Sequence, residues 1–422
     1  MKKIFAILNL LLFFWAFSQT DTAQVIVPNR ENAADVFSKP YVILISADGF
    51  RADYMDKYQS QNLLKMAESG VVAKALIPSF PTITFPNHWS LITGLYPAHH
   101  GLIDNYFYDY QKKKIYAMSN KEAAEDGSWY GGTPLWSLAE KQGLLSASMM
   151  WVGSASDAGG IRPTYYYHYH EKFSPEEKVN KVIDWLHLPE KVRPHFITLY
   201  FPEVDGSGHR FGPDSKETET AVRLVDDAIG SLVKKVKDLG LEDVNLVFVS
   251  DHGMIKVDTE RPLEIPKILF NKERFDFYNA QTLLRVVVKN PAEVKSVYKE
   301  LKKNRTADYD VILTKRFPRK LNFAQRNDRF GRIGQIVLVP NAPKIFLEKG
   351  KKTSHGKHGY SPYKVSEMKA VFVASGPAFK SNKKIGEFKN VNIFPIVAEI
   401  LDLKITDDID GKTNTANQIL VK

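Results

Sequence analysis

The chain has 422 residues, of which 44% are hydrophobic and 12% aromatic. This composition is typical of a globular protein and excludes an intrinsically disordered one. The net charge of +10 comes from lysines and arginines spread along the sequence, which indicates a solvated surface that tolerates anionic substrates and argues against a nucleic-acid-binding module. Because the chain has no cysteine, disulfides, thiolate nucleophiles and thiolate metal ligands are excluded together.

Residues 1–18 are typical of a secretory signal peptide. A pair of lysines precedes a short apolar run, which ends in small residues at Ser18. The run is shorter than the roughly 20 apolar residues of a membrane span, so an uncleaved anchor is the less favoured interpretation. We expect cleavage after Ser18, an N-terminal extension over residues 19–38, and a main domain over residues 39–422. The mature protein is then periplasmic or secreted, without a membrane anchor.

The main domain begins with a pattern of alternating strands and helices. Four continuous apolar runs are typical of strands buried on both faces of a parallel sheet: residues 41–47, 195–201, 244–250 and 370–374. Residues 218–239 have apolar side chains at helical spacing, and Gly240 is suited to end that helix. The pattern predicts an α/β sandwich with a largely parallel central sheet flanked by helices.

Residues 254–340 depart from this alternation. They contain strand-like runs at residues 283–288, 311–314 and 334–339, and a charged helical segment near residues 292–303. We interpret this stretch as a smaller α+β insert, after which the chain returns to the main sheet.

Acidic and histidine residues follow three of the predicted strands. Ligands of open α/β sheets bind at the carboxyl ends of the strands, so these residues are candidates for a site. They are Asp48, Asp205, His209, Asp251 and His252. The four-residue spacing of Asp205 and His209 lets both side chains meet one ion if that loop is helical. A later segment adds His355 and His358.

Each cluster alone also has a plain structural interpretation. An aspartate after a strand is often a turn residue, and Asp-His pairs arise by chance. We interpret a further set of histidines as structural: His88, His99, His100, His168, His170 and His355. Taken together, however, three carboxylates and three histidines supply enough ligands for two divalent ions, and a His/Asp set favours zinc. Two such ions about 4 Å apart stabilise the attacking and leaving oxygens of a phosphoryl displacement.

Thr84 is the candidate nucleophile. Pro86 is favourable in a first helical turn, so we expect a helix to begin at Thr84, to continue to Thr93 and to end at Gly94. The N-terminus of a helix attracts phosphate, and a metal ion can activate a threonine hydroxyl. The alternative at this stage is a threonine that merely caps the helix.

The order of the motifs resembles that of the nucleotide pyrophosphatase/phosphodiesterase family, which belongs to the alkaline phosphatase superfamily. The similarity extends from about residue 41 to residue 379. It depends on six motifs: Ala-Asp48-Gly-Phe-Arg, Thr-x-Thr84-Phe-Pro-Asn-His, Thr-Gly-Leu-Tyr-Pro followed by Asp-Asn105, Asp205-x-x-x-His209, Ser-Asp251-His252-Gly and His358-Gly-Tyr.

The resemblance implies an alkaline-phosphatase-like fold and a catalytic domain that binds two zinc ions. One zinc would be bound by Asp48, Thr84, Asp251 and His252. The other would be bound by Asp205, His209 and His358. Thr84 would attack phosphorus and form a phosphothreonine intermediate, and Asn105 would donate a hydrogen bond to a nonbridging phosphate oxygen.

The resemblance also implies a small phosphodiester substrate, most simply a nucleotide whose base is held between Phe85 and Tyr200. A choline or lipid phosphodiester is an alternative, because quaternary ammonium groups also bind aromatic surfaces. A phosphomonoesterase is another, although only Arg51 and Arg162 are candidates for the extra cations it needs. The alternative outside enzymes is a metal-binding protein without turnover. No stable nucleic-acid partner is expected.

Overall fold

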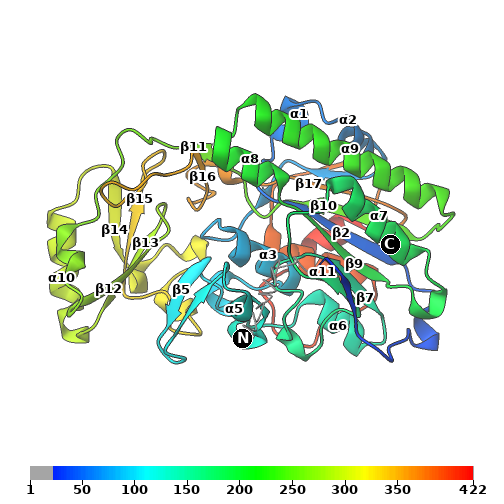
Figure 1. Cartoon of the computed structure of the whole chain (residues 1–422), viewed down its shortest axis with the longest axis horizontal. Helices are drawn as coiled ribbons and strands as arrows, with labels where there is room; N and C mark the ends of the chain where they lie inside the picture. Colours follow the sequence, from blue (N-terminus) through cyan, green and yellow to red (C-terminus); the bar gives the residue numbers. More distant parts are fainter. Residues whose placement is uncertain (1–21, 422) are drawn as a thin grey trace, which may run out of the picture.

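The structure is a computed structural model that describes residues 22–421. The predicted signal peptide lies outside the described residues. Within them, nine strands form the central sheet, in the order β1-β8-β7-β9-β2-β10-β17-β3-β18 (Figure 1). The bounds are β1 Gln24–Ile26, β8 Tyr165–Tyr167, β7 Ser146–Met149, β9 Phe196–Phe201, β2 Tyr41–Ala47, β10 Val244–Val249, β17 Phe372–Ser375, β3 Val71–Ala73 and β18 Lys383–Ile385.

The middle of this sheet is parallel, as predicted. β8, β7, β9, β2 and β10 run in the same direction, and β2, β9 and β10 are buried along their whole length. β17, in contrast, pairs antiparallel with β10, so the parallel character predicted for residues 370–374 is wrong. A strand buried on both faces has the same continuous apolar pattern in either direction, which is why the sequence did not reveal this.

Helices cover both faces of the sheet (Figure 1). One face packs against α2 (Gln61–Ser69), α7 (Pro175–Leu186) and α9 (Lys216–Asp238), whose apolar side chains share one core with β2, β9 and β10. The other packs against α3 (Thr84–Thr93), α6 (Leu135–Lys141) and α11 (Ile393–Ile400). The helix predicted over residues 218–239 is α9, and Gly240 after it has the positive φ of 69° that glycine readily adopts.

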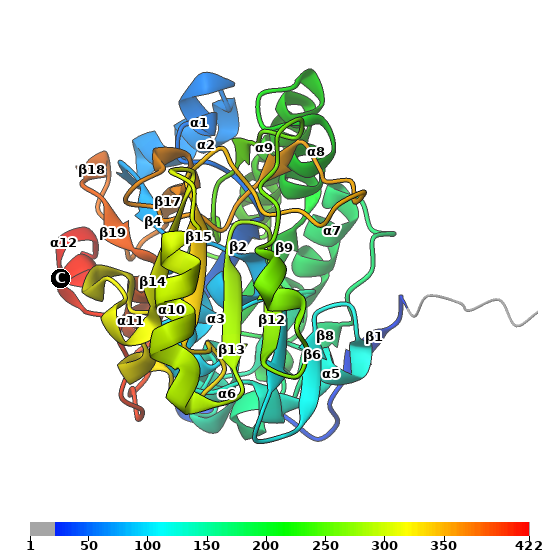
Figure 2. The same ribbon diagram turned by 90° about the vertical axis from the view of Figure 1, so that its left-hand side faces the viewer.

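A second sheet lies within residues 275–340, at the left of Figure 1 and facing the viewer in Figure 2. Its order is β12-β13-β15-β14, with bounds β12 Phe275–Asn279, β13 Leu284–Val288, β15 Ile336–Pro340 and β14 Tyr309–Leu313. All its pairs are antiparallel. α10 (Val294–Lys303) packs Val297 and Leu301 onto it, which gives this insert a core of its own.

The remaining helices and strands are short. They are α1 (Tyr54–Lys57), β4 (Leu76–Ile77), α4 (Pro97–His100), β5 (Tyr106–Asp109), β6 (Lys114–Ala117), α5 (Lys121–Glu125), α8 (Glu203–Phe211), β11 (Ile255–Lys256), β16 (Gly356–Lys357), β19 (Phe388–Lys389) and α12 (Asn414–Ile419). β5 and β6 form a hairpin beside the insert, and β11 pairs with β16. Among residues 22–421, no helix has the length and apolar character needed to cross a membrane.

Candidate active site and metal centre

The predicted ligands come together where neighbouring parallel strands end. Asp48 follows β2, and Asp251 and His252 follow β10. Asp205 and His209 lie on α8, which begins just after β9. The loop after β9 is therefore helical, as the four-residue spacing of Asp205 and His209 requires.

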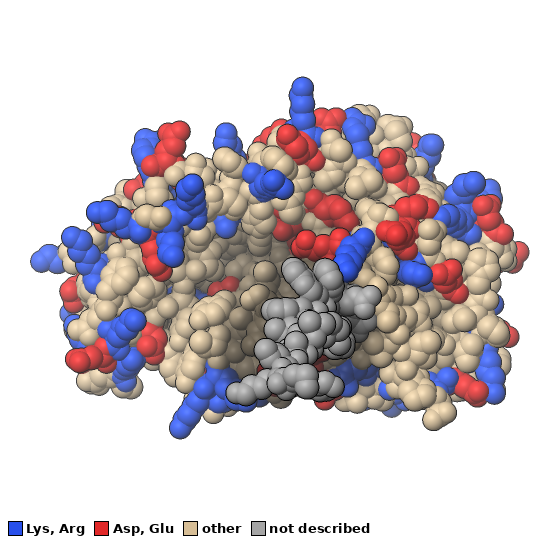
Figure 3. All heavy atoms as spheres, viewed as in Figure 1, with Lys and Arg blue, Asp and Glu red and all other residues tan. Residues whose placement is uncertain are grey.

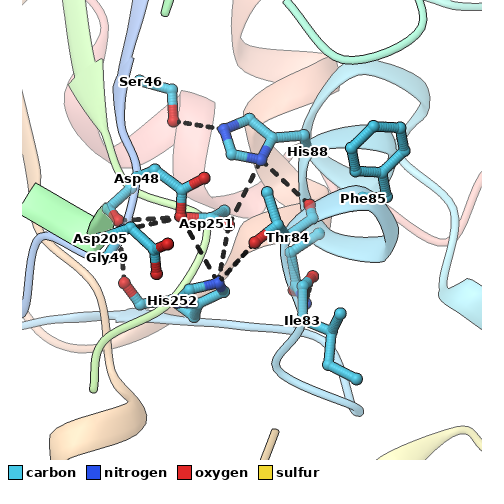
Figure 4. A network of polar contacts seen from close by, with 12 residues as sticks. Ser46, Asp48, Gly49, Ile83, Thr84, Phe85, His88, Asp205, Asp251 and His252 are labelled. Carbon is cyan, nitrogen blue, oxygen red and sulfur yellow. Dashed lines mark hydrogen bonds and ion pairs between the residues drawn. The ribbon is translucent and has the colours of Figure 1, made fainter. Parts of the chain in front are cut away.

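The first group of ligands surrounds His252. Its Nε2 lies 3.0 Å from Oδ2 of Asp251 and 3.5 Å from Oδ1 of Asp48 (Figure 4). The three side chains offer ligand atoms that all lie within 4.8 Å of one another. All three are buried, so the site holds two carboxylates in a region with little water.

The second group is centred on Asp205 and His358, and it also includes His252. His358 follows β16, and its Nε2 lies 3.6 Å from Oδ1 of Asp205. His209 lies beside them, with Nε2 3.4 Å from Oδ2 of Asp205 and 3.1 Å from Nε2 of His358. The rings of His252 and His358 stack with centroids 3.6 Å apart, so the two groups adjoin. The side chain of His355 is exposed, outside both groups.

The histidines are oriented as metal ligands usually are. Nδ1 of His209 lies 2.8 Å from the carbonyl oxygen of Gly356, Nδ1 of His358 lies 2.8 Å from that of Thr82, and Nδ1 of His252 lies 3.0 Å from that of Gly253. Each Nδ1 therefore carries the proton, which leaves a lone pair on each Nε2. Those lone pairs point into the site and are able to bind a cation there.

The carboxylates also fit metal binding. Oδ1 of Asp48, Oδ1 of Asp205 and Oδ2 of Asp251 are buried and have no hydrogen-bond partner among the described residues. Unpaired buried carboxylate oxygens are costly unless a cation binds them. With nitrogen and oxygen donors and no sulfur, the donor set suits zinc and related divalent ions.

The pKa values also indicate that the buried carboxylates lack a positive partner. Burial, together with the neighbouring Asp205, raises the pKa of Asp251 to about 8, and burial and Asp251 raise the pKa of Asp48. Burial lowers the pKa values of His252 and His358, which keeps their imidazoles neutral and able to bind a metal. The protein alone thus provides too little positive charge for its own carboxylates.

Thr84 is the first residue of α3, as predicted, and Gly94 ends that helix with a φ of 67°. The N-cap residue is Ile83 and Thr84 is already inside the helix, so the capping interpretation of Thr84 is wrong. The hydroxyl of Thr84 instead points toward the carboxylates, with Oγ1 3.2 Å from Nε2 of His252 (Figure 4).

His88 lies one turn along α3 and is fully buried. Its Nδ1 lies 3.0 Å from the carbonyl oxygen of Thr84 and 3.3 Å from Oδ2 of Asp251, and its Nε2 lies 2.9 Å from Oγ of Ser46. It is a satisfied buried histidine, as predicted, but its contacts also hold the first turn of α3 against the metal site. The four-residue spacing from Thr84 was the signal for that role.

Asn105 lies beside the N-terminus of α3. Its Oδ1 accepts a hydrogen bond of 3.1 Å from the backbone N–H of Phe85. Within residues 22–421 no group accepts a hydrogen bond from Nδ2, so the donor end of the amide is available to a ligand. The ring of Phe85 points to the opposite side of α3 from the Thr84 hydroxyl (Figure 4).

Tyr200 has a contact that the sequence did not predict. Its hydroxyl donates a 2.7 Å hydrogen bond to Oδ2 of Asp48, and only 7% of the residue is exposed. Tyr169, which follows β8, has its ring 6.3 Å from that of Tyr200 and is 55% exposed. Burial and the charges of Glu171 and Asp48 raise the pKa of Tyr169. Sequence reasoning named Tyr200 as one side of a base slot but missed Tyr169, because β8 is too short to recognise as a strand.

The fold and the site define an α/β protein of the alkaline-phosphatase-like class with a candidate metal centre at the carboxyl ends of its central strands. The chain belongs to the type I phosphodiesterase/nucleotide pyrophosphatase family, whose family model matches residues 42–361.

Curated relatives include a pyrophosphatase/phosphodiesterase of Schizosaccharomyces pombe described as uncharacterized, which is 35% identical over 88% of this chain and 79% of its own length. Venom phosphodiesterase 2 of Crotalus adamanteus is 33% identical over 91% of this chain, and ectonucleotide pyrophosphatase/phosphodiesterase family member 1 of Rattus norvegicus is 34% identical over 87%. The match covers only 48% and 41% of those two longer proteins.

Among solved structures, murine ectonucleotide pyrophosphatase/phosphodiesterase 5 has a TM-score of 0.82 and 27% identity, over 90% of this chain and 100% of the other. That structure is described as an inactive threonine-to-alanine variant in complex with AMP. The human protein of the same name gives a TM-score of 0.82 and 26% identity.

Proposed function

We propose that this protein hydrolyses phosphodiester or pyrophosphate bonds of nucleotides, with Thr84 as the nucleophile. One observation carries the proposal. The Thr84 hydroxyl lies at the N-terminus of α3 and 3.2 Å from His252, beside three carboxylates that each have an unpaired buried oxygen. A nucleophile, an anion-binding helix end and a cation site thus share one place. The activities named for the relatives support this function.

Two divalent cations, most simply zinc, would bind to the two ligand sets. The first set comprises Asp48, Thr84, Asp251 and His252. The second comprises Asp205, His209 and His358. When bound, the cations supply the positive charge that activates the threonine hydroxyl and stabilises the leaving oxygen.

In the first displacement, Oγ of Thr84 attacks phosphorus while the bond to the leaving oxygen breaks, and the threonine proton passes to solvent. Nδ2 of Asn105 donates to a nonbridging oxygen, on which negative charge accumulates in the transition state. In the second displacement, water attacks from the vacated side, the Oγ–P bond breaks and Thr84 regains its proton. The α3 N-terminus faces the phosphate throughout both steps.

The substrate class follows from the aromatic side chains around the site. Phe85 lies next to the nucleophile, and the exposed ring of Tyr169 lies against the buried Tyr200, whose hydroxyl is bonded to Asp48. Stacking of a base on such surfaces contributes about 1–3 kcal/mol. The face in Figure 3 is hollowed beside the insert, and in the part of the hollow that the grey atoms leave visible, lysines and arginines do not gather into one stripe. A small nucleotide fits this arrangement better than a nucleic-acid duplex.

The test compares three substrates on zinc-loaded protein: the p-nitrophenyl ester of thymidine 5′-monophosphate, p-nitrophenyl phosphocholine and p-nitrophenyl phosphate. We expect the nucleotide ester to have the highest kcat/KM and a chelator to abolish its hydrolysis. A preference for the choline ester would replace this function by that of a headgroup phosphodiesterase, and a preference for the monoester by that of a phosphatase.

Substitutions at Phe85 and Tyr200 are expected to affect different kinetic constants. Phe85→Ala removes a stacking surface, so KM for the nucleotide ester should rise roughly 5- to 100-fold with a small change in kcat. Tyr200→Phe keeps the ring but removes the hydrogen bond to Asp48, so zinc affinity and kcat should fall instead, by about tenfold. Initial-rate kinetics and a zinc titration of both variants separate these effects. A KM increase confined to Tyr200→Phe would contradict the assignment.

We also propose export with removal of residues 1–18, on the strength of the lysine pair and apolar run described above. N-terminal sequencing of the protein recovered from the periplasm or medium checks this. A mature chain that begins at Gln19 is expected, and a chain retained in the membrane fraction with Met1 intact would refute it.

A further inference from the structure

The insert contacts the segment that carries Asn105. Arg285, on β13 of the insert, is fully buried. Its Nη2 donates hydrogen bonds to Oδ2 of Asp104, at 3.0 Å, and to the carbonyl oxygen of Tyr106, at 2.9 Å. Asp104 and Tyr106 are the neighbours of Asn105 on either side, so one guanidinium holds both flanks of the proposed oxyanion donor.

Asp104 continues this contact into Asn105 itself. Its second oxygen, Oδ1, accepts a 2.7 Å hydrogen bond from the backbone N–H of Asn105. The carbonyl oxygen of Asn105 accepts from the N–H of Met118 at 2.9 Å, and its Oδ1 accepts from Phe85. With these groups fixed, the direction of Nδ2 is set by the surrounding chain.

The ion pair is shielded from solvent. The side chains of Arg285 and Asp104 are 0% and 6% exposed, respectively. Burial raises the pKa of Asp104, and the charge of Arg285 opposes that shift. The same guanidinium lies over the ring of Tyr278 at 5.2 Å and donates through Nη1 to the carbonyl oxygen of Arg332. Both of those residues lie within residues 254–340, so Arg285 is itself held by the insert.

We propose that Arg285 is a positioning residue for hydrolysis: it holds Asn105 through Asp104 and thereby makes the insert part of the catalytic apparatus. The inference depends on the proposed function, because it assumes that Nδ2 of Asn105 donates to the phosphate. Among residues 22–421, Arg285 contacts neither the proposed metal ligands nor Thr84, so its effect on the reaction passes through Asn105.

The chain offers a matched control in Arg332. It is also a buried arginine of the insert, with a 2.8 Å ion pair to Asp109 and hydrogen bonds to the carbonyl oxygens of Gly101 and Trp129. Its contacts stabilise the same region of the main domain, but none is to Asn105 or to a residue adjacent to it. A purely structural role predicts similar behaviour for the two arginines.

The experiment is a double-mutant cycle with Asn105→Ala, measured with the nucleotide ester. Lysine keeps the charge at position 285 but has a single nitrogen, so it cannot donate to the carbonyl oxygen of Arg332, as Nη1 does, while also donating to Asp104 and Tyr106, as Nη2 does. Arg285→Lys should therefore lower kcat by roughly 10- to 100-fold and change KM less than about threefold. In the Asn105→Ala background, Arg285→Lys should lower kcat by less than about threefold, because the amide that Arg285 positions is absent. Arg332→Lys should have the same effect in both backgrounds.

The inference would be overturned if Arg285→Lys lowered kcat by the same factor in the wild type and in the Asn105→Ala variant. Asp104→Asn provides a second variant if Arg285→Lys does not fold, since it keeps an acceptor for the Asn105 N–H and loses the ion pair. It should show the same non-additivity. Failure of the proposed function is distinguishable, because the wild type would then not hydrolyse the nucleotide ester or would not need Thr84.

Discussion

Replacing Thr84 with alanine is expected to reduce kcat for the nucleotide ester by at least about 10⁴-fold while leaving the fold intact. Removal of a nucleophile eliminates the covalent route, and losses of this size are typical of such changes. The free energy of unfolding should change little, because the Thr84 side chain does not cap α3. Within residues 22–421, the hydrogen bond of its hydroxyl is to His252 in the candidate metal site. Steady-state kinetics and thermal unfolding of the zinc-loaded variant measure both quantities.

Thr84→Ser is the matched control, since it keeps a hydroxyl at the same position. It should retain measurable activity and should form a phosphoserine that mass spectrometry detects after rapid denaturation. Undiminished activity in Thr84→Ala would refute the covalent mechanism, whichever substrate is preferred.

Removing the metal is expected to expose the cost of burying Asp251, and this cost grows with pH. The pKa of Asp251 is raised from 3.8 to about 8 by burial and by Asp205, so between those pH values the folded state holds more protons than the unfolded state. The contribution of Asp251 to the free energy of unfolding therefore falls as the pH rises through that window. In metal-free protein at pH 8, Asp251→Asn should be more stable than wild type by at least about 2 kcal/mol.

Asparagine suits this comparison because its Oδ1 still accepts the hydrogen bond from the backbone N–H of Gly49. The advantage of the variant should shrink toward pH 4. With saturating zinc the order should reverse, because wild type then gains a ligand that the variant lacks. Urea unfolding at several pH values, with chelator and with zinc, measures each difference. A wild type that is more stable than the variant at pH 8 without metal would contradict the assignment of Asp251 to the cation site.

The sequence predicted the parts of the fold that depend on local pattern. The apolar run at residues 41–47 matches β2 residue for residue, and the helical spacing before Gly240 locates α9. Strand direction depends on pairing partners far along the chain, so the antiparallel direction of β17 could not be predicted from the local pattern. Short strands such as β8 have too few residues for a periodic pattern.

The candidate site was predicted in the same uneven way. Residues that follow long strands, such as Asp48 and Asp251, were identifiable because chain order places them at one sheet edge. The supporting contacts could not be identified from the sequence. Tyr200 donates a hydrogen bond to Asp48 and Arg285 donates one to Asp104, and in each pair the two residues are more than a hundred positions apart. Such contacts are decided by tertiary packing and leave no local signal in the sequence.

The proposed ligands come from segments that are far apart in the sequence. The first is Asp48, which follows β2, and the last is His358, which lies after the insert. Two cations bound there would therefore act as cross-links that close very large loops of the chain, and a cross-link of this kind restricts the unfolded state. If the protein is exported, as we propose, they would take the place that disulfides hold in many extracellular enzymes, because this chain has no cysteine. The supply of metal outside the cell would then govern how long the protein survives proteases as well as how fast it turns over its substrate.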